Sequence, residues 1–333
     1  MTSSSSEPRR RLGEFALIAK LFAPLSKGAK GAFDLTDDAA TLNLPEGREL
    51  VVTVDTLIEG VHFLPDDPAD LVARKALRVN LSDLAAKGAE PHGYLIALSL
   101  APWIEDPWLE RFAMGLQEDQ SRYGVHLLGG DTTSGPGPLT ISITALGSVP
   151  RHRMIRRVGA QPGDAVYVSG TIGDAGAGLD ILRDEGASLS HNHREHLIGR
   201  YRLPEPRLSL GARLHGFASA SIDVSDGLLA DLGHIAEVSN VGIVIHAARI
   251  PLSPAYRALG RTGSDAIVRA ATLGDDYEIA FTAPRSAHAA VEAAAGDLNI
   301  SLTKIGLVQQ GKGAILMEDG KVLSVPRAGY THF

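Results

Sequence analysis

The sequence of 333 residues contains no cysteine. This excludes disulfide bonds, a thiolate nucleophile and cysteine-ligated zinc or iron–sulfur centres. Long apolar runs are also missing, because the longest, Tyr94 to Ala101, is far shorter than the ~20 residues that a membrane helix needs. The Ser-rich segment from Met1 to Arg11 has no apolar stretch behind it, which indicates a frayed terminus rather than a signal peptide. We therefore expect a cytoplasmic protein without a membrane partner, with a disordered tail at residues 1–12.

The chain has few aromatic residues, 5%, and a formal net charge of −7. A nucleic-acid-binding protein needs basic patches and stacking platforms, so this composition argues against a nucleic-acid partner. Hydrophobic residues at 44% and charged residues at 21% are typical of globular domains, and the length suffices for two. An acidic enzyme that handles phosphates would have to recruit divalent cations.

Apolar periodicity and turn residues predict alternating helices and strands along the whole chain. A Pro- and Gly-containing basic stretch at residues 150–163 indicates a domain boundary. We expect an α+β fold, with an N-terminal domain at residues 13–150 built on a mixed sheet with helices and a C-terminal α+β domain at residues 151–333. The predicted helices are 14–22, 68–87, 106–123, 195–202, 207–214, 228–238 and 285–295, and the predicted strands are 49–55, 94–100, 139–149, 165–169, 242–246, 277–282 and 305–309.

The segment Leu128-Gly129-Gly130-Asp131 follows a short apolar run and precedes a turn-rich stretch. We expect Asp131 at a strand end, with the glycines letting a ligand approach the backbone. An ordinary tight turn with a solvated Asp is the alternative, since glycine and aspartate are common turn residues.

Further acids are predicted at strand ends or helix openings, and together they match the oxygen ligands that Mg²⁺ prefers in phosphoryl transfer. Taken singly, each fits a cap or a turn: Asp226 stands where a helix N-cap is expected, and Asp275-Asp276 resembles a turn before a strand. Asn80, Asp83 and Lys87 share one face of their predicted helix. The acids are Asp37, Asp38, Asp55, Asp83, Asp131, Asp223, Asp226, Asp275 and Asp276.

The sequence lacks a P-loop, a dinucleotide-binding glycine fingerprint and the protein-kinase motifs, so a nucleotide would have to bind in another way. Arg157, with Arg153 and Arg156 nearby, could hold a triphosphate or could belong to a solvated linker. His62 could contact a substrate or be an ordinary loop histidine. The histidines at 191, 193 and 196 indicate a polar surface.

An ordered set of motifs resembles the thiamine-monophosphate kinase family, which is grouped with the aminoimidazole-ribotide and selenophosphate synthetases. The resemblance runs from about Glu14 to the end of the chain and implies a two-domain aminoimidazole-ribotide-synthetase-like fold. The motifs are Thr36-Asp37-Asp38-Ala39, Val54-Asp55-Thr56-Leu57, His62-Phe63, Asn80-Leu81-Ser82-Asp83-Leu84-Ala85, Gly129-Gly130-Asp131-Thr132-Thr133, Ile222-Asp223-Val224-Ser225-Asp226-Gly227 and Asp275-Asp276-Tyr277-Glu278.

The resemblance implies ATP-dependent phosphorylation of thiamine monophosphate to thiamine diphosphate by direct in-line transfer, assisted by several Mg²⁺ ions, in a homodimer whose N-terminal domain binds ATP and metal. No residue is assigned as a general base, because the attacking phosphate oxygen is already anionic. The implied metal ligands are Asp38, Thr53, Val54, Asp55, Asp83, Asp131, Asp223 and Asp226. The implied ATP contacts are Gly130, Asp131, Arg157 and Ser225, and the implied substrate contacts are His62, Asp275 and Arg327.

Three positions depart from the family pattern: Thr36 replaces a glycine, Asp275 replaces a glutamate and Arg327 replaces an aromatic residue. These changes concern substrate recognition more than ATP or metal binding. Two other functions stay open, namely a related ATP-dependent synthetase or kinase acting on another small molecule, and a nucleotide-binding regulatory module without turnover.

Overall fold

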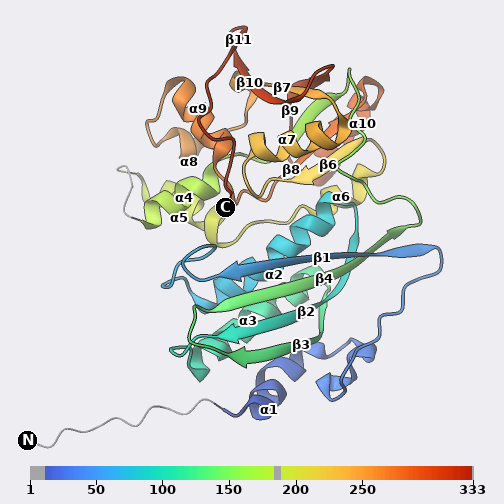
Figure 1. Cartoon of the computed structure of the whole chain (residues 1–333), viewed down its shortest axis with the longest axis vertical. Helices are drawn as coiled ribbons and strands as arrows, with labels where there is room; N and C mark the ends of the chain where they lie inside the picture. Colours follow the sequence, from blue (N-terminus) through green and yellow to red (C-terminus); the bar gives the residue numbers. More distant parts are fainter. Residues whose placement is uncertain (1–11, 184–188, 332–333) are drawn as a thin grey trace, which may run out of the picture. The chain divides into compact units, whose positions relative to one another are not determined.

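The computed structural model describes residues 12–183 and 189–331 (Figure 1). The predicted tail at residues 1–12 therefore lies, apart from Leu12, outside the described residues. The chain divides into two compact units that alternate along the sequence, so the predicted boundary between residues 150 and 151 stays a prediction. The first unit comprises Met1–Pro45, Val54–Leu77 and Pro91–Leu146, and the second comprises Glu46–Thr53, Arg78–Glu90 and Gly147–Phe333.

A four-stranded sheet in the order β1-β4-β2-β3 carries helices α2 and α3 on one face (Figure 1). Residues on β2 alternate, since Tyr94 and Ile96 are buried whereas Leu95 is 39% exposed. Because side chains alternate across a strand, the buried set forms the core under the helices and the other set faces outward. The strands are β1 Arg48–Ile58, β2 Glu90–Leu100, β3 His126–Ser134 and β4 Thr140–Pro150, and the helices are α2 Ala69–Ala86 and α3 Asp106–Tyr123.

Helix α3 has the bounds that its sequence predicts. A proline in its first turn is compatible with the missing hydrogen bonds there, and Gly124 ends the helix with a left-handed φ of 67°. The helix packs closely on α2, because a Cβ at Gly115 would lie 2.3 Å from the Asp70 carbonyl oxygen. The ion pair between Arg74 Nε and Asp119 at 3.1 Å joins the same two helices.

Short helical turns precede this sheet, and they replace the single helix predicted at residues 14–22. The chain forms one α-helical turn and continues as a π-helix, so helical periodicity is retained but regular α-helical hydrogen bonding is not. These elements are α1 Glu14–Leu17, the π-helix η1 Ile18–Phe22 and the 3₁₀ helices η2 Ala23–Ser26 and η3 Lys30–Leu35.

The second unit contains a seven-stranded mixed sheet in the order β11-β10-β7-β9-β5-β8-β6. Strands β10 and β7 are parallel, whereas β7–β9, β9–β5, β5–β8, β8–β6 and β10–β11 are antiparallel. The strands are β5 Ala165–Ser169, β6 Ala220–Asp223, β7 Gly242–His246, β8 Ile279–Ala283, β9 Leu302–Gln309, β10 Gly313–Glu318 and β11 Lys321–Val322.

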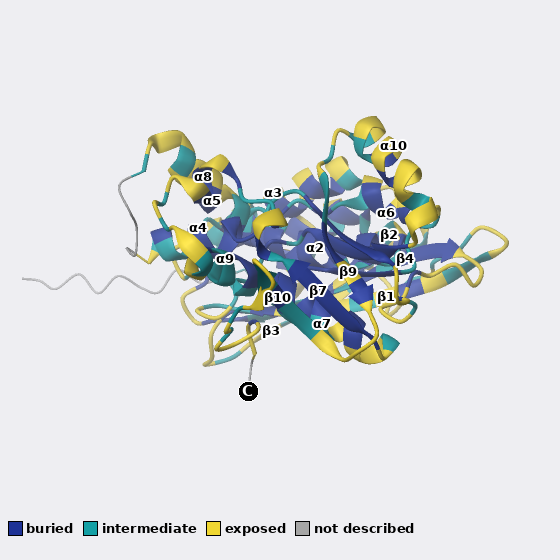
Figure 2. Ribbon diagram, turned by 90° about the horizontal axis from the view of Figure 1, so that it is seen from above, coloured by how far each residue is buried: buried dark blue, intermediate teal, exposed yellow. Residues whose placement is uncertain are grey.

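Helices cover both faces of this sheet. On β5, Val166 and Val168 join the core that contains α7, whereas Ala165 and Tyr167 join the core that contains α6 and α10. Figure 2 shows β7 as buried and the outer side of α10 as exposed. The helices are α4 Asp174–Leu182, α5 His191–Arg202, α6 Leu208–Leu214, α7 Leu228–Ser239, α8 Pro254–Arg257, α9 Gly263–Thr272 and α10 His288–Leu298, with the short 3₁₀ turns η4 Ala247–Arg249 and η5 Arg285–Ala287.

Most of the predicted helices and strands are confirmed, although α8, α9, β6, β10 and β11 were not predicted, and β8 begins two residues later than predicted. One local prediction is wrong: Asp131 does not follow a strand but lies inside β3, paired with Ala97 of β2. The glycines before it continue the strand, because β2 approaches so closely that only glycine fits at residue 130. Across the described part of the chain, no helix combines the length and apolarity needed to span a membrane.

Candidate functional site

The turn between β6 and α7 carries the predicted acids Asp223 and Asp226. Asp223 ends β6 and is only 4% exposed, and its Oδ2 accepts a hydrogen bond of 2.8 Å from the Ser82 hydroxyl of α2. Ser82 belongs to the Asn80–Ala85 motif and Asp223 to the Ile222–Gly227 motif, so these two motifs are in direct contact within the second unit. This contact fixes a carboxylate at the end of a buried strand.

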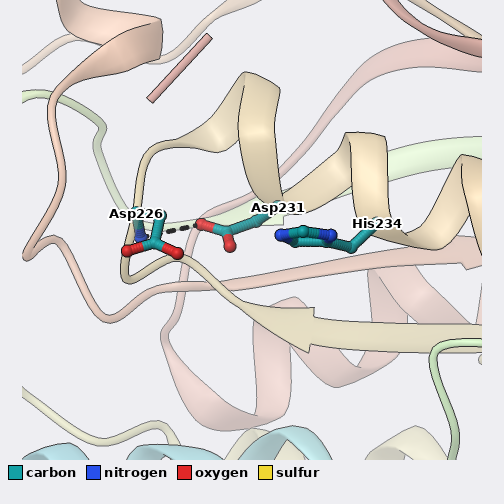
Figure 3. A group of neighbouring side chains, drawn as sticks. All are labelled: Asp226, Asp231 and His234. Atoms are coloured by element: carbon teal, nitrogen blue, oxygen red, sulfur yellow. Dashed lines mark hydrogen bonds between the residues drawn. The ribbon is translucent and has the colours of Figure 1, made fainter. Parts of the chain in front are cut away.

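Asp231, which the sequence did not single out, holds this turn in place (Figure 3). Its Oδ2 accepts hydrogen bonds of 3.1 Å from the backbone N–H groups of Asp226 and Gly227. The predicted N-cap role of Asp226 is wrong, because the helix N-cap is Gly227 and no side chain caps it. In the sequence, Asp231 is an acid among the apolar residues of a helix. Only the fold shows that this acid is buried and not exposed.

Asp226, Asp231 and His234 bring three potential metal-ligand atoms within 4.8 Å of one another. Burial raises the pKa of Asp231 well above its usual value, and the carboxylates of Asp223 and Asp226 raise it further. A buried acid beside two like charges favours its neutral form, which the two backbone hydrogen bonds oppose only in part. The raised pKa of Asp231 thus reflects both its burial and the negative charge that Asp223 and Asp226 bring to this turn.

A cavity of about 490 Å³ in the second unit is lined by Thr53, Asp83, Lys87, Arg156 and Arg157. Apart from these side chains, its wall is apolar. The Thr53 hydroxyl donates a hydrogen bond of 2.5 Å to Asp83 Oδ2, so two of the predicted metal ligands are in contact. The cavity combines three cationic side chains with an oxygen-donor pair.

Lys87 connects the cavity to the β6 strand. Its Nζ donates a hydrogen bond of 2.9 Å to the Ser221 carbonyl oxygen. Burial lowers the pKa of Lys87, and the Arg157 cation lowers it further, whereas Asp223 and Asp83 oppose the shift. Lys87 therefore lies in the field of both acids, and Asp83 and Lys87 of the predicted polar stripe line the cavity.

The predicted substrate residues Asp275 and Arg327 lie near the same turn through backbone contacts. The Asp275 N–H donates 2.8 Å to the Ser225 carbonyl oxygen, and the Tyr330 N–H donates 2.9 Å to the Asp226 carbonyl oxygen. Arg327 is exposed and bonds to the carbonyl oxygen of Thr331 at 3.1 Å and also to its hydroxyl. The C-terminal segment that carries Arg327 is thus hydrogen-bonded to the acid turn.

The first unit holds the other predicted residues. His62 is partly buried: its Nδ1 accepts 3.0 Å from the Ile58 N–H, and its carbonyl oxygen accepts 2.9 Å from Lys75 Nζ. These bonds orient the imidazole from a turn at the end of β1. Asp55 is partly exposed on β1, and Val54, Asp38, Gly130 and Asp131 are exposed.

In the second unit Thr53 thus contacts Asp83, and Ser82, the neighbour of Asp83, contacts Asp223. The implied metal ligand Asp131 belongs to the first unit, whereas Asp83 and Asp226 belong to the second, so their shared role as ligands stays a prediction.

The sequence matches the model of the AIR synthase related protein N-terminal domain over residues 36–149 and that of the C-terminal domain over residues 161–318. Thiamine-monophosphate kinase of Escherichia coli strain K12 is 42% identical over 326 residues, which cover 96% of this chain and 98% of that protein. The chain belongs to the thiamine-monophosphate kinase family. The predicted resemblance and the predicted two-domain α+β fold are therefore confirmed.

Solved structures of the thiamine-monophosphate kinase family agree with this assignment. The crystal structure of thiamine-monophosphate kinase from Stenotrophomonas maltophilia K279a has a TM-score of 0.81 and 42% identity, covering 94% of this chain and 98% of that chain. A structure of AaThiL complexed with AMPPCP and TMP has a TM-score of 0.77 and 34% identity, covering 99% of this chain and 100% of that chain.

Proposed function

We propose that the chain phosphorylates thiamine monophosphate to thiamine diphosphate with ATP, by direct in-line phosphoryl transfer. The observation that carries this proposal is the hydrogen bond from Lys87, in the cation-lined cavity, to Ser221 of β6, the strand that ends at Asp223, within a chain of this kinase family. Both substrates are anionic, so the site has to bind negative charge while it also holds carboxylates. That combination is what metal-assisted phosphoryl transfer requires.

The donor set fits Mg²⁺, because it consists of carboxylate, hydroxyl and carbonyl oxygens without cysteine. Thr53 and Asp83 are in contact at 2.5 Å, and Asp223 is fixed by Ser82, so these oxygens are already oriented. When bound, the ions supply positive charge that offsets the repulsion between the two phosphate groups. The residues proposed to hold them are Asp38, Thr53, Val54, Asp55, Asp83, Asp131, Asp223 and Asp226.

ATP is proposed to contact Gly130, Asp131, Arg157 and Ser225. Arg157 lines the cavity, where a guanidinium can bind phosphate oxygens in a fixed geometry. We add Lys87 to this set, because it lines the same cavity and its Nζ has donors beyond the one bound to Ser221. These cations orient the triphosphate, and no side chain is needed as a general base.

Thiamine monophosphate is proposed to contact His62, Asp275 and Arg327. The turn at His62 and the backbone at Asp275 are each fixed by hydrogen bonds of 3.0 Å or less, so both side chains start from ordered positions. The thiazolium ring is cationic and matches a carboxylate at residue 275 better than a guanidinium at residue 327. Arg327 is better suited to the phosphate of the substrate.

A homodimer is proposed as the functional form, in the cytoplasm, where the reaction draws on ATP. Support comes from the outward face of the four-stranded sheet, where Leu50, Val52 and Val54 on β1 are 47%, 54% and 58% exposed. A contiguous apolar face of this kind marks an interaction surface in a monomer.

The direct test is turnover of thiamine monophosphate with ATP and MgCl₂, with thiamine diphosphate measured by chromatography. Asp83→Asn is expected to lower kcat by at least roughly 100-fold, equivalent to about 2.7 kcal/mol in the barrier, with little change in melting temperature. Asp297→Asn is the matched control, because Asp297 forms only an exposed ion pair with Arg213.

Failure of the wild-type protein to form thiamine diphosphate would contradict the proposal. If such a protein still hydrolysed or transferred phosphate from ATP with another small molecule, a related synthetase activity would replace it. If it bound ATP without any turnover, the regulatory module would be the better assignment.

A further inference from the structure

The segment from Gly274 to Glu278 has an unusual backbone. Asp275 and Tyr277 have φ values of 70° and 50°, in the left-handed region that non-glycine residues rarely adopt. Such conformations persist only where the surroundings fix them, and they occur preferentially at ligand-binding sites. The contacts that fix this segment therefore bear on the geometry of the site.

One side of the segment is bound to the acid turn. Asp275 N–H donates to the Ser225 carbonyl oxygen, Tyr277 N–H donates to the Val224 carbonyl oxygen, and Val224 N–H donates to the Glu278 carbonyl oxygen, each at 2.8 Å. A Cβ at residue 274 would lie 2.4 Å from the Ser225 carbonyl oxygen, so the approach there requires glycine. Three backbone hydrogen bonds therefore join the segment to the turn.

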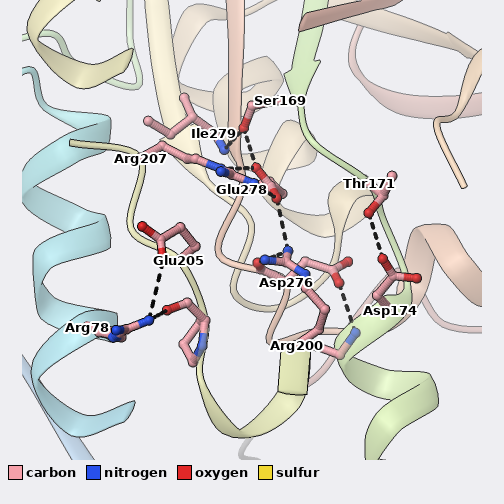
Figure 4. Close-up of polar contacts among 12 residues, drawn as sticks. Arg78, Ser169, Thr171, Asp174, Arg200, Glu205, Arg207, Asp276, Glu278 and Ile279 are labelled. Atoms are coloured by element: carbon pink, nitrogen blue, oxygen red, sulfur yellow. Dashed lines mark hydrogen bonds and ion pairs between the residues drawn. The ribbon is translucent and has the colours of Figure 1, made fainter. Parts of the chain in front are cut away.

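The other side is anchored by two acids that are fully buried, Asp276 and Glu278 (Figure 4). The Asp276 carboxylate accepts hydrogen bonds of 2.6 Å from the Gly173 N–H and 3.2 Å from the Ala175 N–H, at the start of α4. Arg207 binds the Glu278 carboxylate through two of its nitrogens, at 2.7 and 2.5 Å. Residues 276 and 278 thus point into the unit, while residues 275 and 277 stay partly exposed.

Arg200 joins both anchors. One of its terminal nitrogens donates 2.8 Å to the Asp276 carbonyl oxygen and 2.9 Å to Glu278 Oε1. It is thereby bound to the backbone between the two left-handed residues and to the side chain that ends the segment. We propose that Arg200 is a positioning residue for thiamine monophosphate, because it holds the left-handed segment that presents Asp275 to the substrate.

This inference rests on the proposed function and extends it to a residue that does not itself bind substrate. Arginine suits the task, since its permanently charged planar guanidinium holds the two N–H groups of that one nitrogen in a fixed geometry, whereas the donors of a lysine ammonium rotate on a flexible stem. The expected defect is specific: Asp275 is displaced, whereas the cavity cations Lys87 and Arg157 are not.

The test compares Arg200→Lys and Arg200→Met with Arg213→Met, a control on α6 whose ion pair with Asp297 is exposed. Arg200→Met is expected to raise KM for thiamine monophosphate by roughly tenfold or more and to leave KM for ATP within about twofold. Arg200→Lys is expected to recover part of the loss, and the control to change neither value. Binding of thiamine monophosphate by calorimetry, without ATP, is expected to weaken by the same factors.

Hydrogen exchange gives a second readout, because the N–H groups of Asp275 and Tyr277 make the hydrogen bonds that Arg200 protects. Their exchange is expected to accelerate in both Arg200 variants and not in the control. If Arg200→Met does not fold, KM and hydrogen exchange of Arg200→Lys test the inference alone, since this variant keeps a cation beside Glu278.

An equal rise of KM for both substrates, or an unchanged KM for thiamine monophosphate in the folded variants, would overturn the inference. Failure of the proposed function would instead appear in the wild-type protein as absent turnover. The two failures are therefore distinguishable.

Discussion

Asp276 and Glu278 lie two residues apart and are both fully buried, but their pKa values shift in opposite directions. Burial is the largest effect on each and raises both. At Glu278, the cations of Arg200 and Arg207 and the Ser169 hydroxyl outweigh burial and lower the pKa. At Asp276, Arg200 and two backbone N–H groups offset burial only in part, and the pKa rises to about 8.

The raised pKa of Asp276 makes the stability of the fold depend on pH. Between the usual value of 3.8 and the folded value of about 8, the unfolded chain has released a proton that the folded chain still holds. The contribution of this group to the free energy of unfolding therefore falls as the pH rises through that window. Asp276→Asn keeps an acceptor oxygen for one of the two N–H groups, which bind different oxygens of Asp276, and it removes the titration.

We expect the free energy of unfolding of the wild type, relative to Asp276→Asn, to fall by on the order of a few kcal/mol between about pH 5 and about pH 8. Urea unfolding at both pH values measures this difference, and titrations common to the two proteins cancel. Asp297→Asn, at an exposed ion pair, serves as the control. A difference between wild type and Asp276→Asn that does not change with pH would show that Asp276 is ionised in the folded state.

At the scale of the element, strand β3 shows how a functional motif can be built on a structural requirement. Gly130 pairs with Ile96 of β2, and a Cβ at residue 130 would lie 2.0 Å from the Ile96 carbonyl oxygen. The glycine is thus required by the neighbouring strand, whether or not ATP lies against it. The ATP contact proposed for Gly130 remains a separate prediction.

Gly130→Ala is expected to destabilise the protein by about 1–3 kcal/mol, because β2 and β3 must move apart. The matched control is Gly137→Ala, whose added Cβ meets no atom within 4 Å and is expected to change stability by less than about 0.5 kcal/mol. Chemical unfolding of both variants measures the difference. Equal stabilities would mean that the strands adjust without cost.

Elements with strong local signals were predictable from sequence. Helix α3 and strands β5 and β7 have the predicted bounds, because proline, glycine and apolar periodicity mark them locally. Strand β10 was missed because it is ordered by parallel pairing with β7, a contact that local sequence does not encode. Strand β6 was not predicted, because it has only four residues and its last one, Asp223, belongs to the acid motif.

The sequence predicts the residue types of the candidate site, but it does not predict the residues that hold them in place. Asp223 and Asp83 follow from the motifs, and in the second unit Asp223 contacts Ser82, the neighbour of Asp83. Arg200 was not identified because its partner Asp276 is far along the chain, and Asp231 because its two local hydrogen bonds depend on the conformation of the preceding turn. Only the fold shows which charged residues are buried and support the site through hydrogen bonds.

At the scale of the whole molecule, the four-stranded sheet has helices on one face and exposed apolar residues on the other. Leu95 lies on β2, an inner strand of the sheet, and is 39% exposed. A stable interface buries about 800 Å² per partner and places apolar residues at its centre. A charge there would have to be desolvated without a partner, which is strongly unfavourable.

Leu95→Lys is therefore expected to convert the proposed dimer to monomer at micromolar concentration, as measured by sedimentation velocity. Met114→Lys is the control, because Met114 is 66% exposed on α3 and lies on the helical side of the first unit. It introduces the same charge and is expected to leave the dimer intact. A wild-type protein that sediments as a monomer at all concentrations would refute the dimer itself, and a Leu95→Lys dimer as stable as the wild type would place the interface away from this sheet face.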